Sequence, residues 1–146
     1  MDKIKVHNFK FILFPSQQYK IFKKYFKDGG DEKFRYEFEL NSNSIVFDLG
    51  GYKGQWASDI YARYNSRILI FEPVKLFSDK ILKRFNKNPK IEVYSFALGS
   101  NRRSEIITVG EDETSLYKKF SDFKEVIHFE DACQFFKEKK IDHIVY

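Results

Sequence analysis

Two acidic residues and three glycines form the part of the sequence best suited to binding a ligand. Asp48 follows the apolar run 45–47, and Gly50, Gly51 and Gly54 come directly after it. This pattern predicts a buried parallel strand that ends at a tight turn, with a helix beginning at Gln55. Glycine suits such a turn, because it accepts a positive φ and lets a ligand approach the backbone. In open α/β sheets, ligands sit at this carboxyl end of the strands.

The order of the glycines separates the candidate ligands. A dinucleotide-binding fingerprint requires G-x-G-x-x-G, but position 49 is leucine. A P-loop requires Gly-Lys-Ser/Thr, but Lys53 precedes Gly54 and Gln55 follows it. The observed D-x-G-x-x-x-G resembles the first motif of class I S-adenosylmethionine-dependent methyltransferases. An ordinary turn between a strand and a helix is the alternative interpretation of this motif alone.

Glu72 supplies a second acid in a similar position, 24 residues after Asp48 and at the end of the apolar run 68–71. An acid at the tip of the next strand can accept hydrogen bonds from both ribose hydroxyls of a nucleoside. Hydrogen bonds to a charged acceptor contribute roughly 1.5–3 kcal/mol each. The competing interpretation is a solvated carboxylate at a helix start, with Pro73 at the first helical position. The spacing from the glycine turn favours the nucleoside site.

The surrounding pattern supplies the elements that would position these acids. Apolar runs indicate strands at 45–49, 67–71 and 91–97, and residues at helical spacing indicate helices after Gln55 and after Pro73. The order predicts an α/β protein with a Rossmann-like, doubly wound, mostly parallel sheet. In that sheet the third strand ends near Glu72, so Phe96, Ala97 and Leu98 would border an adenine. Further strands are predicted at 106–109, 125–129 and 141–146, with a helix at 131–140.

Residues 1–44 are predicted to form an N-terminal α+β extension, or cap, on a core of residues 45–146. A strand is expected at 6–13, and a helix from the N-cap Ser16 to Phe26, with aromatic residues on one face and lysines around it. Such a basic amphipathic helix can lie on a membrane surface, although packing on the domain is the commoner arrangement. The alternation over 33–40 predicts a half-exposed strand, and 41–44 a turn.

The composition describes a packed protein rather than a disordered one, since 42% of its 146 residues are hydrophobic and 32% are charged. The single cysteine, Cys133, excludes an internal disulfide and fits a reducing cytoplasm. Its place in an apolar helix predicts a buried small side chain rather than a nucleophile. The three histidines are scattered, so no metal site is predicted. The longest apolar run, 11–14, predicts neither a signal peptide nor a transmembrane segment, and a cytoplasmic location is expected.

Taken together, residues 45 to 146 resemble the FkbM-type family of class I S-adenosylmethionine-dependent methyltransferases. The matching stretches are 46–54, 70–73, 95–99, 114–116 and 141–146. The resemblance implies that the cofactor is S-adenosyl-L-methionine and that its binding residues are Asp48, Gly50, Gly51, Tyr52, Gly54, Glu72, Pro73, Ala97, Leu98 and Ser115. By this resemblance, Asp48 faces the methionine amino group, the glycines face the methionine backbone, Glu72 binds the ribose, and Ala97 with Leu98 contacts the adenine. Family members methylate a hydroxyl, commonly of a sugar or a polyketide-type natural product, so a small-molecule or glycan hydroxyl is the expected acceptor.

The sequence departs from the family in two places. Gly51 stands where alanine is common. The family's acidic segment after the fourth strand is not reached before Tyr146, so we expect a truncated core that is inactive alone, and no catalytic residue is assigned. A fourth strand left as an uncovered sheet edge would favour self-association.

Two other functions are compatible with the sequence. A net charge of +5 and a pI near 9.1 would support methylation of RNA. The lysines are spread over most predicted helices, however, and this argues against a nucleic-acid partner. A non-catalytic nucleoside-binding or interaction module would retain the same cofactor half of the fold. Salt-dependent RNA binding would favour the first, and cofactor binding without turnover the second.

Overall fold

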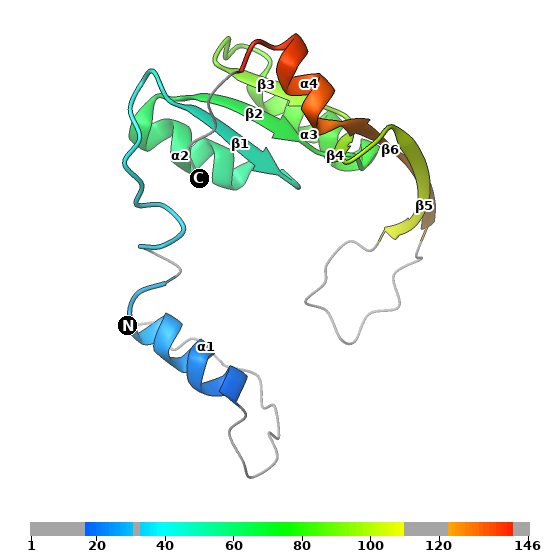
Figure 1. Cartoon of the computed structure of the whole chain (residues 1–146). Coiled ribbons are helices and arrows are strands. Elements are labelled where there is room, and N and C mark those ends of the chain that lie inside the picture. Colours follow the sequence, from blue (N-terminus) through cyan, green and yellow to red (C-terminus); the bar gives the residue numbers. More distant parts are fainter. Residues whose placement is uncertain (1–16, 31–32, 110–122, 142–146) are drawn as a thin grey trace. The chain divides into compact units, whose positions relative to one another are not determined.

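The computed structural model describes residues 17–30, 33–109 and 123–141 and shows an α/β protein (Figure 1). The chain divides into two compact units, residues 1–39 and residues 40–146. The larger unit contains two small open sheets, one parallel and one mixed. None of the helices in the described ranges combines the length and apolar character needed to cross a lipid bilayer.

The N-terminal unit contains one helix, α1, from Gln17 to Lys27. It ends through a hydrogen bond from Gly30 N to Tyr25 O (2.8 Å), with Gly29 at φ +73°. The predicted helix is therefore confirmed, whereas its proposed N-cap Ser16 and the strand predicted at 6–13 lie outside the described residues.

The strand predicted over residues 33–40 is wrong. Lys33 N donates to Gly29 O and Glu37 N donates to Lys33 O, both at 2.7 Å, so this segment forms successive turns. These bonds turn the backbone back on itself, which an extended strand does not allow, and no described strand pairs with the segment. The apolar alternation therefore reflects separate exposed and half-buried side chains rather than one covered face.

The first sheet contains three parallel strands in the order β1-β2-β3. These are β1 (Ile45–Leu49), β2 (Arg67–Phe71) and β3 (Ile91–Tyr94). The predicted turn at 41–44 leads into β1, with Ser44 N donating to Asn41 O at 3.0 Å. Register places Leu49 beside Phe71, and therefore the carboxyl ends of β1 and β2 lie side by side.

Two helices connect these strands, α2 (Gln55–Tyr64) and α3 (Lys75–Phe85). The apolar spacing predicts a buried stripe of Trp56, Ala57, Ile60 and Tyr64 on α2. Ala57 and Ile60 are buried, whereas Trp56 and Tyr64 are half-buried. Asn65, in the left-handed conformation at φ +53°, ends α2. Helix α3 buries Phe77 and Ile81 and begins two residues after Pro73, so Pro73 does not occupy the first helical position.

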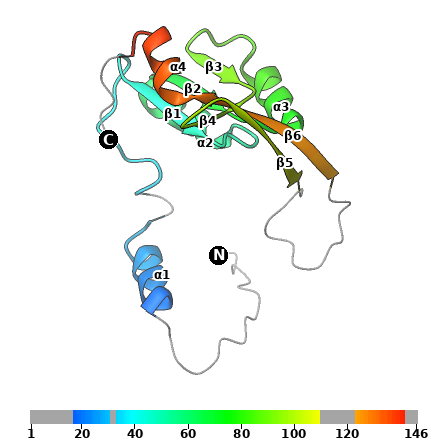
Figure 2. The ribbon, with the colours of Figure 1, turned by 45° about the vertical axis from the view of Figure 1, so that its right-hand side comes forward.

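Helices cover both faces of the parallel sheet (Figures 1 and 2). Helix α4 (Ala132–Glu138) places Phe135 against Phe71 of β2, with ring centroids 5.3 Å apart, and Phe136 against Phe47 of β1 at 5.1 Å. Because side chains alternate along a strand, Ile70 points to the opposite face. There it lies close to the glycine turn, on the side covered by α3.

The third predicted strand, residues 91–97, is divided between two sheets. Strand β3 ends at Tyr94, where Glu72 N donates to Tyr94 O at 3.0 Å. The next N–H in line for β3 is that of Val74, which donates to Glu72 Oε1 at 2.9 Å instead, so the ladder with β3 stops there. The chain then bends at 95–96, and β4 (Ala97–Gly99) begins the second sheet instead of ending the first.

The second sheet has the order β4-β6-β5, with β5 (Arg103–Val109) antiparallel and β4 parallel to β6 (Phe123–Asp131). The strands predicted at 106–109 and 125–129 are confirmed and are longer than expected. This sheet packs against the start of α3, where Val109 joins Val74 and Phe77 in a buried cluster. Lys75 N also donates to Glu125 Oε1 of β6 at 2.8 Å.

The predicted helix at 131–140 is confirmed as α4, with Asp131 as its N-cap accepting from Gln134 N at 2.9 Å. Cys133 is exposed, however, so its expected burial is wrong. Phe135 and Phe136 make the ring contacts of α4 with the parallel sheet, and Cys133, in the first turn of the helix, stays exposed. A fourth core strand was predicted at 141–146. Ile141 belongs to no strand and its N donates to Phe136 O at 3.0 Å, while residues 142–146 lie outside the described residues.

Candidate functional site

In the glycine turn after β1, three alternate residues adopt the left-handed conformation. Gly50 has φ +85°, Tyr52 +48° and Gly54 +72°. Gly50 N donates to Phe71 O at 2.9 Å, which fastens the turn to the end of β2. A positive φ is costly for residues with a Cβ, so the fold itself accounts for glycine at 50 and 54.

The space around each glycine shows which of them faces a possible ligand. A Cβ on Gly51 would lie 2.3 Å from Ile70 Cγ2, and one on Gly54 would lie 2.9 Å from Phe85 Cε2. Both glycines therefore allow the turn to pack on β2 and α3. A Cβ on Gly50 would meet no atom within 4 Å, so open space for a ligand lies beside Gly50.

Asp48 is a buried acid that lacks a complete set of hydrogen bonds. The residue is 9% exposed, and its buried Oδ2 has no hydrogen-bond partner among the described residues. Burial raises the pKa of Asp48, and the negative charge of Glu72 raises it further, to about 6. A buried acceptor without a donor typically costs about 1–3 kcal/mol, and more when it is charged. A ligand that donates a hydrogen bond, above all a cationic one, would relieve this cost.

Glu72 is buried as well, but both of its carboxylate oxygens have partners. The residue is 5% exposed; Oε2 accepts from Tyr52 N at 2.8 Å, and Oε1 accepts from Val74 N at 2.9 Å. The interpretation of Glu72 as a solvated carboxylate is therefore wrong. Each carboxylate oxygen has two lone-pair sites, so Glu72 retains acceptor capacity for a ligand hydroxyl while it anchors the turn.

The two acids form one electrostatic unit at the carboxyl ends of adjacent strands. Glu72 affects the pKa of Asp48 through its charge, although the two residues come from different strands. Two buried carboxylates disfavour an anionic group such as phosphate and favour cations or hydroxyl donors. This arrangement suits a ligand with a positive charge at one end and hydroxyls at the other.

Arg84 supports the glycine turn from α3 and was not singled out by the sequence pattern. Its guanidinium donates to Lys53 O at 2.9 Å and to Gln55 Oε1 at 2.8 Å. Tyr52 packs edge-on against Phe77 of the same helix, with ring centroids 4.5 Å apart. The only sequence signal for Arg84 was its place beside the buried stripe of α3, where a basic side chain ordinarily faces water.

The other predicted site residues are distributed differently. Pro73 is half-buried beside Glu72, whereas Ala97 and Leu98 belong to β4 and pair with Phe129 and Glu130 of β6. Ser115 and its neighbour Thr114 lie outside the described residues. Because Glu72 N bonds to Tyr94 O, the end of β3 does lie beside Glu72. Contact of residues 97–98 with an adenine stays a prediction. No group of three or more His, Cys, Asp or Glu in the described ranges could hold a metal ion.

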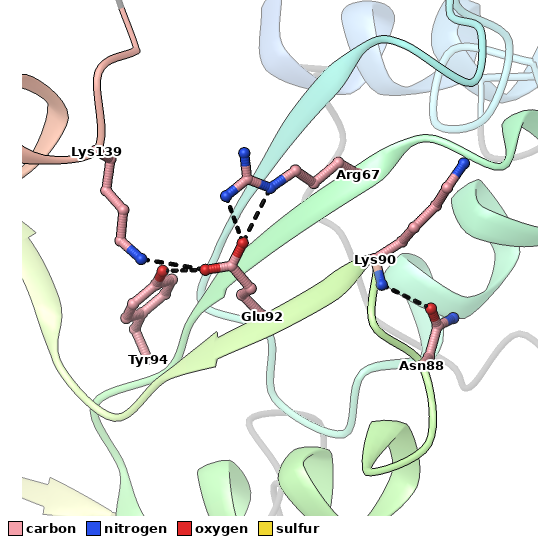
Figure 3. A network of polar contacts seen from close by, with 6 residues as sticks. All are labelled: Arg67, Asn88, Lys90, Glu92, Tyr94 and Lys139. Carbon is pink, nitrogen blue, oxygen red and sulfur yellow. Dashed lines mark hydrogen bonds and ion pairs between the residues drawn. The ribbon is translucent and has the colours of Figure 1, made fainter.

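A second polar cluster joins the parallel sheet to the end of α4 (Figure 3). Arg67 Nε donates to Glu92 Oε1 at 2.9 Å, while Tyr94 Oη and Lys139 Nζ donate to Glu92 Oε2, the latter at 3.2 Å. Burial alone would raise the pKa of Glu92. The hydrogen bonds from Tyr94, Arg67 and Lys139 and the charge of Arg67 outweigh it and lower the pKa to about 2.

This cluster predicts a loss of stability in acid. An acid whose pKa is lowered by folding stabilises the protein above its unfolded pKa, near 4.5, and this contribution disappears as the pH falls toward 2. Because the cluster is partly solvated, we expect it to contribute about 1–2 kcal/mol. Glu92→Gln should flatten the fall in the free energy of unfolding between pH 4.5 and 2, measured by urea titration. Glu105→Gln, which removes an exposed pair with Arg103, should leave that fall unchanged, and equal profiles for wild type and Glu92→Gln would contradict the assignment.

Comparison of the chain with models of protein families gives no match, and comparison with curated proteins gives no significant match. The likeness to FkbM-type methyltransferases therefore rests on the chain's own motifs.

Proposed function

We propose that the unit 40–146 binds S-adenosylmethionine and that the protein is an S-adenosylmethionine-dependent O-methyltransferase acting on a sugar or another small natural product. One observation carries this proposal: the buried Oδ2 of Asp48 has no hydrogen-bond donor among the described residues and lies next to a glycine turn. An amino group with a positive charge is the partner that such an oxygen lacks. The methionine part of the cofactor carries this group.

The remaining geometry is consistent with the two ends of that cofactor. The open space beside Gly50 gives the methionine chain room to pass the backbone. Glu72, on the adjacent strand, would accept hydrogen bonds from the ribose hydroxyls through its remaining lone pairs. The parallel order β1-β2-β3 with helices on both faces is compatible with the first half of a Rossmann-like, doubly wound sheet.

The residues in this site would act by binding and alignment. S-adenosylmethionine, when bound, supplies an electrophilic methyl group on a sulfonium. Asp48 and Glu72 would fix the two ends of the cofactor, and alignment of reacting groups of this kind can contribute several kcal/mol, with about 7–11 kcal/mol as the range for well-oriented reactions. None of the described residues is assigned as a general base.

A non-catalytic nucleoside-binding module would use the same two acids. A binding measurement cannot distinguish this module from an enzyme. An assay of methyl transfer to an added sugar or natural-product hydroxyl can. Methylated product from the chain supports the enzyme. Binding of the cofactor without product in a longer native chain supports the module.

The binding proposal is tested by the melting temperature of the chain with S-adenosylhomocysteine. A ligand at about 100 times its Kd stabilises the native state by about 2.7 kcal/mol. For a chain of this size that corresponds to a rise of about 5–11 °C. ATP and NAD, matched in adenosine but carrying phosphates, should produce a much smaller rise, because two buried carboxylates disfavour an anion. No rise at millimolar S-adenosylhomocysteine, or an equal rise with ATP, would refute the proposal.

A further inference from the structure

Helix α1 is amphipathic, with its charged residues on one side and its large apolar residues on the other. Its four lysines, at positions 20, 23, 24 and 27, recur every three or four residues and therefore lie along one side. Ile21, Phe22, Tyr25 and Phe26 lie along the other side. The helix contains no acidic residue, so its charged side is entirely cationic.

The apolar side of α1 is open to solvent within its own unit. Ile21 and Phe22 are 62% exposed and Phe26 is 61% exposed. Phe34 extends this surface: it is exposed and packs on Tyr25, with ring centroids 6.1 Å apart. Three large side chains with more than half of their surface in water form a larger apolar area than scattered surface residues provide.

We propose that α1 lies on an anionic membrane surface, with its aromatic side in the interface and its lysines among the lipid headgroups. The charge is complementary, since four lysines without a neighbouring acid in the helix face a negatively charged leaflet. Apolar positions i, i+1, i+4 and i+5 make a broad face rather than the narrow row of anchors at i, i+3/i+4 and i+7 with which a helix enters a protein groove. A broad apolar face beside a lysine-rich face suits a planar interface.

The first test measures co-sedimentation of the full chain with lipid vesicles. We expect binding to vesicles of phosphatidylcholine mixed with phosphatidylserine, weaker binding at high salt, and much weaker binding to pure phosphatidylcholine. Because each lysine near an anionic leaflet raises the affinity about fivefold, Lys23→Glu/Lys24→Glu should lower it by at least about 25-fold. Lys83→Glu/Lys87→Glu, at and just beyond the end of α3, gives the same net charge and should bind nearly as wild type. Equal losses in the two variants would overturn the proposal in favour of diffuse attraction by net charge.

A second variant tests the aromatic side. Phe22→Ser/Phe26→Ser leaves every charge in place, yet it should lower binding to the phosphatidylserine vesicles at least tenfold, because the interface no longer receives the two rings. Leu82→Ser, on the exposed side of α3, is the matched apolar control and should not change binding. Unchanged binding of the Phe22/Phe26 variant overturns the proposal.

Two further results would also overturn it by identifying another occupant of this side of α1. Absence of vesicle binding, with a dimer that dissociates in the Phe22/Phe26 variant, would assign the side to a second copy of the chain. Absence of vesicle binding, with a lower melting temperature of residues 40–146 in that variant, would assign it to the chain's own larger unit.

Discussion

Asp48→Asn should stabilise the free protein and at the same time remove most of its affinity for S-adenosylmethionine. In the free protein, burial and the charge of Glu72 both oppose ionisation of Asp48 and raise its pKa from 3.8 to about 6. At neutral pH that shift corresponds to roughly 3 kcal/mol of destabilisation. An asparagine amide removes the charge but retains a buried polar group, so we expect a net gain of about 1–2 kcal/mol in the free energy of unfolding.

The pH dependence of stability identifies Asp48 as the cause. The native state holds this proton more tightly than the unfolded state, so the stabilising contribution is complete below pH 3.8 and is lost as the pH rises to about 6. Wild-type stability should therefore fall as the pH rises through this window. The contribution of Glu92 has the opposite sign, because its stabilisation is lost as the pH falls below 4.5. Asp48→Asn should remove the fall between pH 4 and 6. Asp79→Asn, in an exposed pair with Lys75, is the matched control and should retain it.

Cofactor binding should respond in the opposite direction. A cationic amino group binds the ionised form of Asp48, so the affinity of the wild type should weaken about tenfold for each pH unit below 6. Calorimetry at pH 5, 6 and 7 would measure this slope, which Asp48→Asn should abolish together with most of the affinity. A variant that binds S-adenosylhomocysteine as tightly as wild type would exclude Asp48 from the site.

Local patterns were sufficient for the elements that carry the two acids. The runs that end at Leu49 and Phe71 are parallel strands, as predicted. The second is buried over 68–71, whereas the first is buried only at Val46 and Asp48. The stripe containing Ile60 defines α2, because apolar periodicity follows directly from which side is covered. The glycine turn was equally readable, since positive φ at Gly50 and Gly54 is a local property of the backbone.

The errors occurred where distant parts of the chain decide the structure. The pattern of residues 91–97 suits one strand, but β3 ends at Tyr94 because the next N–H in line, that of Val74, donates to the Glu72 side chain instead. Residues 33–40 alternate well, yet they have no described strand to pair with. Cys133 lies in a helix that contacts the parallel sheet through its two phenylalanines, and the cysteine itself is exposed. A single sequence window contains none of these neighbours.

The site itself was predicted in its residue types more than in its contacts. The acid at the end of each strand was visible, but the bonds from Tyr52 N and Val74 N to Glu72 were not, because a backbone N–H has no sequence signature. The sequence motif assigned Gly51 to cofactor binding. In the structure, the side chain of Ile70 leaves no room for a Cβ at this position. A glycine in this turn can therefore match a binding motif and also be required by packing.

Glu72→Gln should produce the second large effect, a loss of the cofactor-dependent rise in melting temperature together with a less stable free protein. Both Glu72 oxygens accept backbone N–H bonds, and the amide of glutamine presents a donor to one of these N–H groups. The loss of one buried hydrogen bond to a charged group should cost about 1–3 kcal/mol. The rise of about 5–11 °C with S-adenosylhomocysteine should disappear, because the ribose hydroxyls lose their charged acceptor.

A variant of comparable instability separates the two causes. Ile127→Val trims a buried side chain in β6, in the other sheet, and should cost about 0.5–1.5 kcal/mol while keeping the full rise with S-adenosylhomocysteine. Glu72→Gln also removes one of the two causes that raise the pKa of Asp48, so the fall in stability between pH 4 and 6 should move to lower pH. Equal rises in wild type and Glu72→Gln would remove Glu72 from the site. An altered pH profile with an intact rise would mean that Glu72 only fastens the turn to α3, and the ribose would then need an acceptor elsewhere.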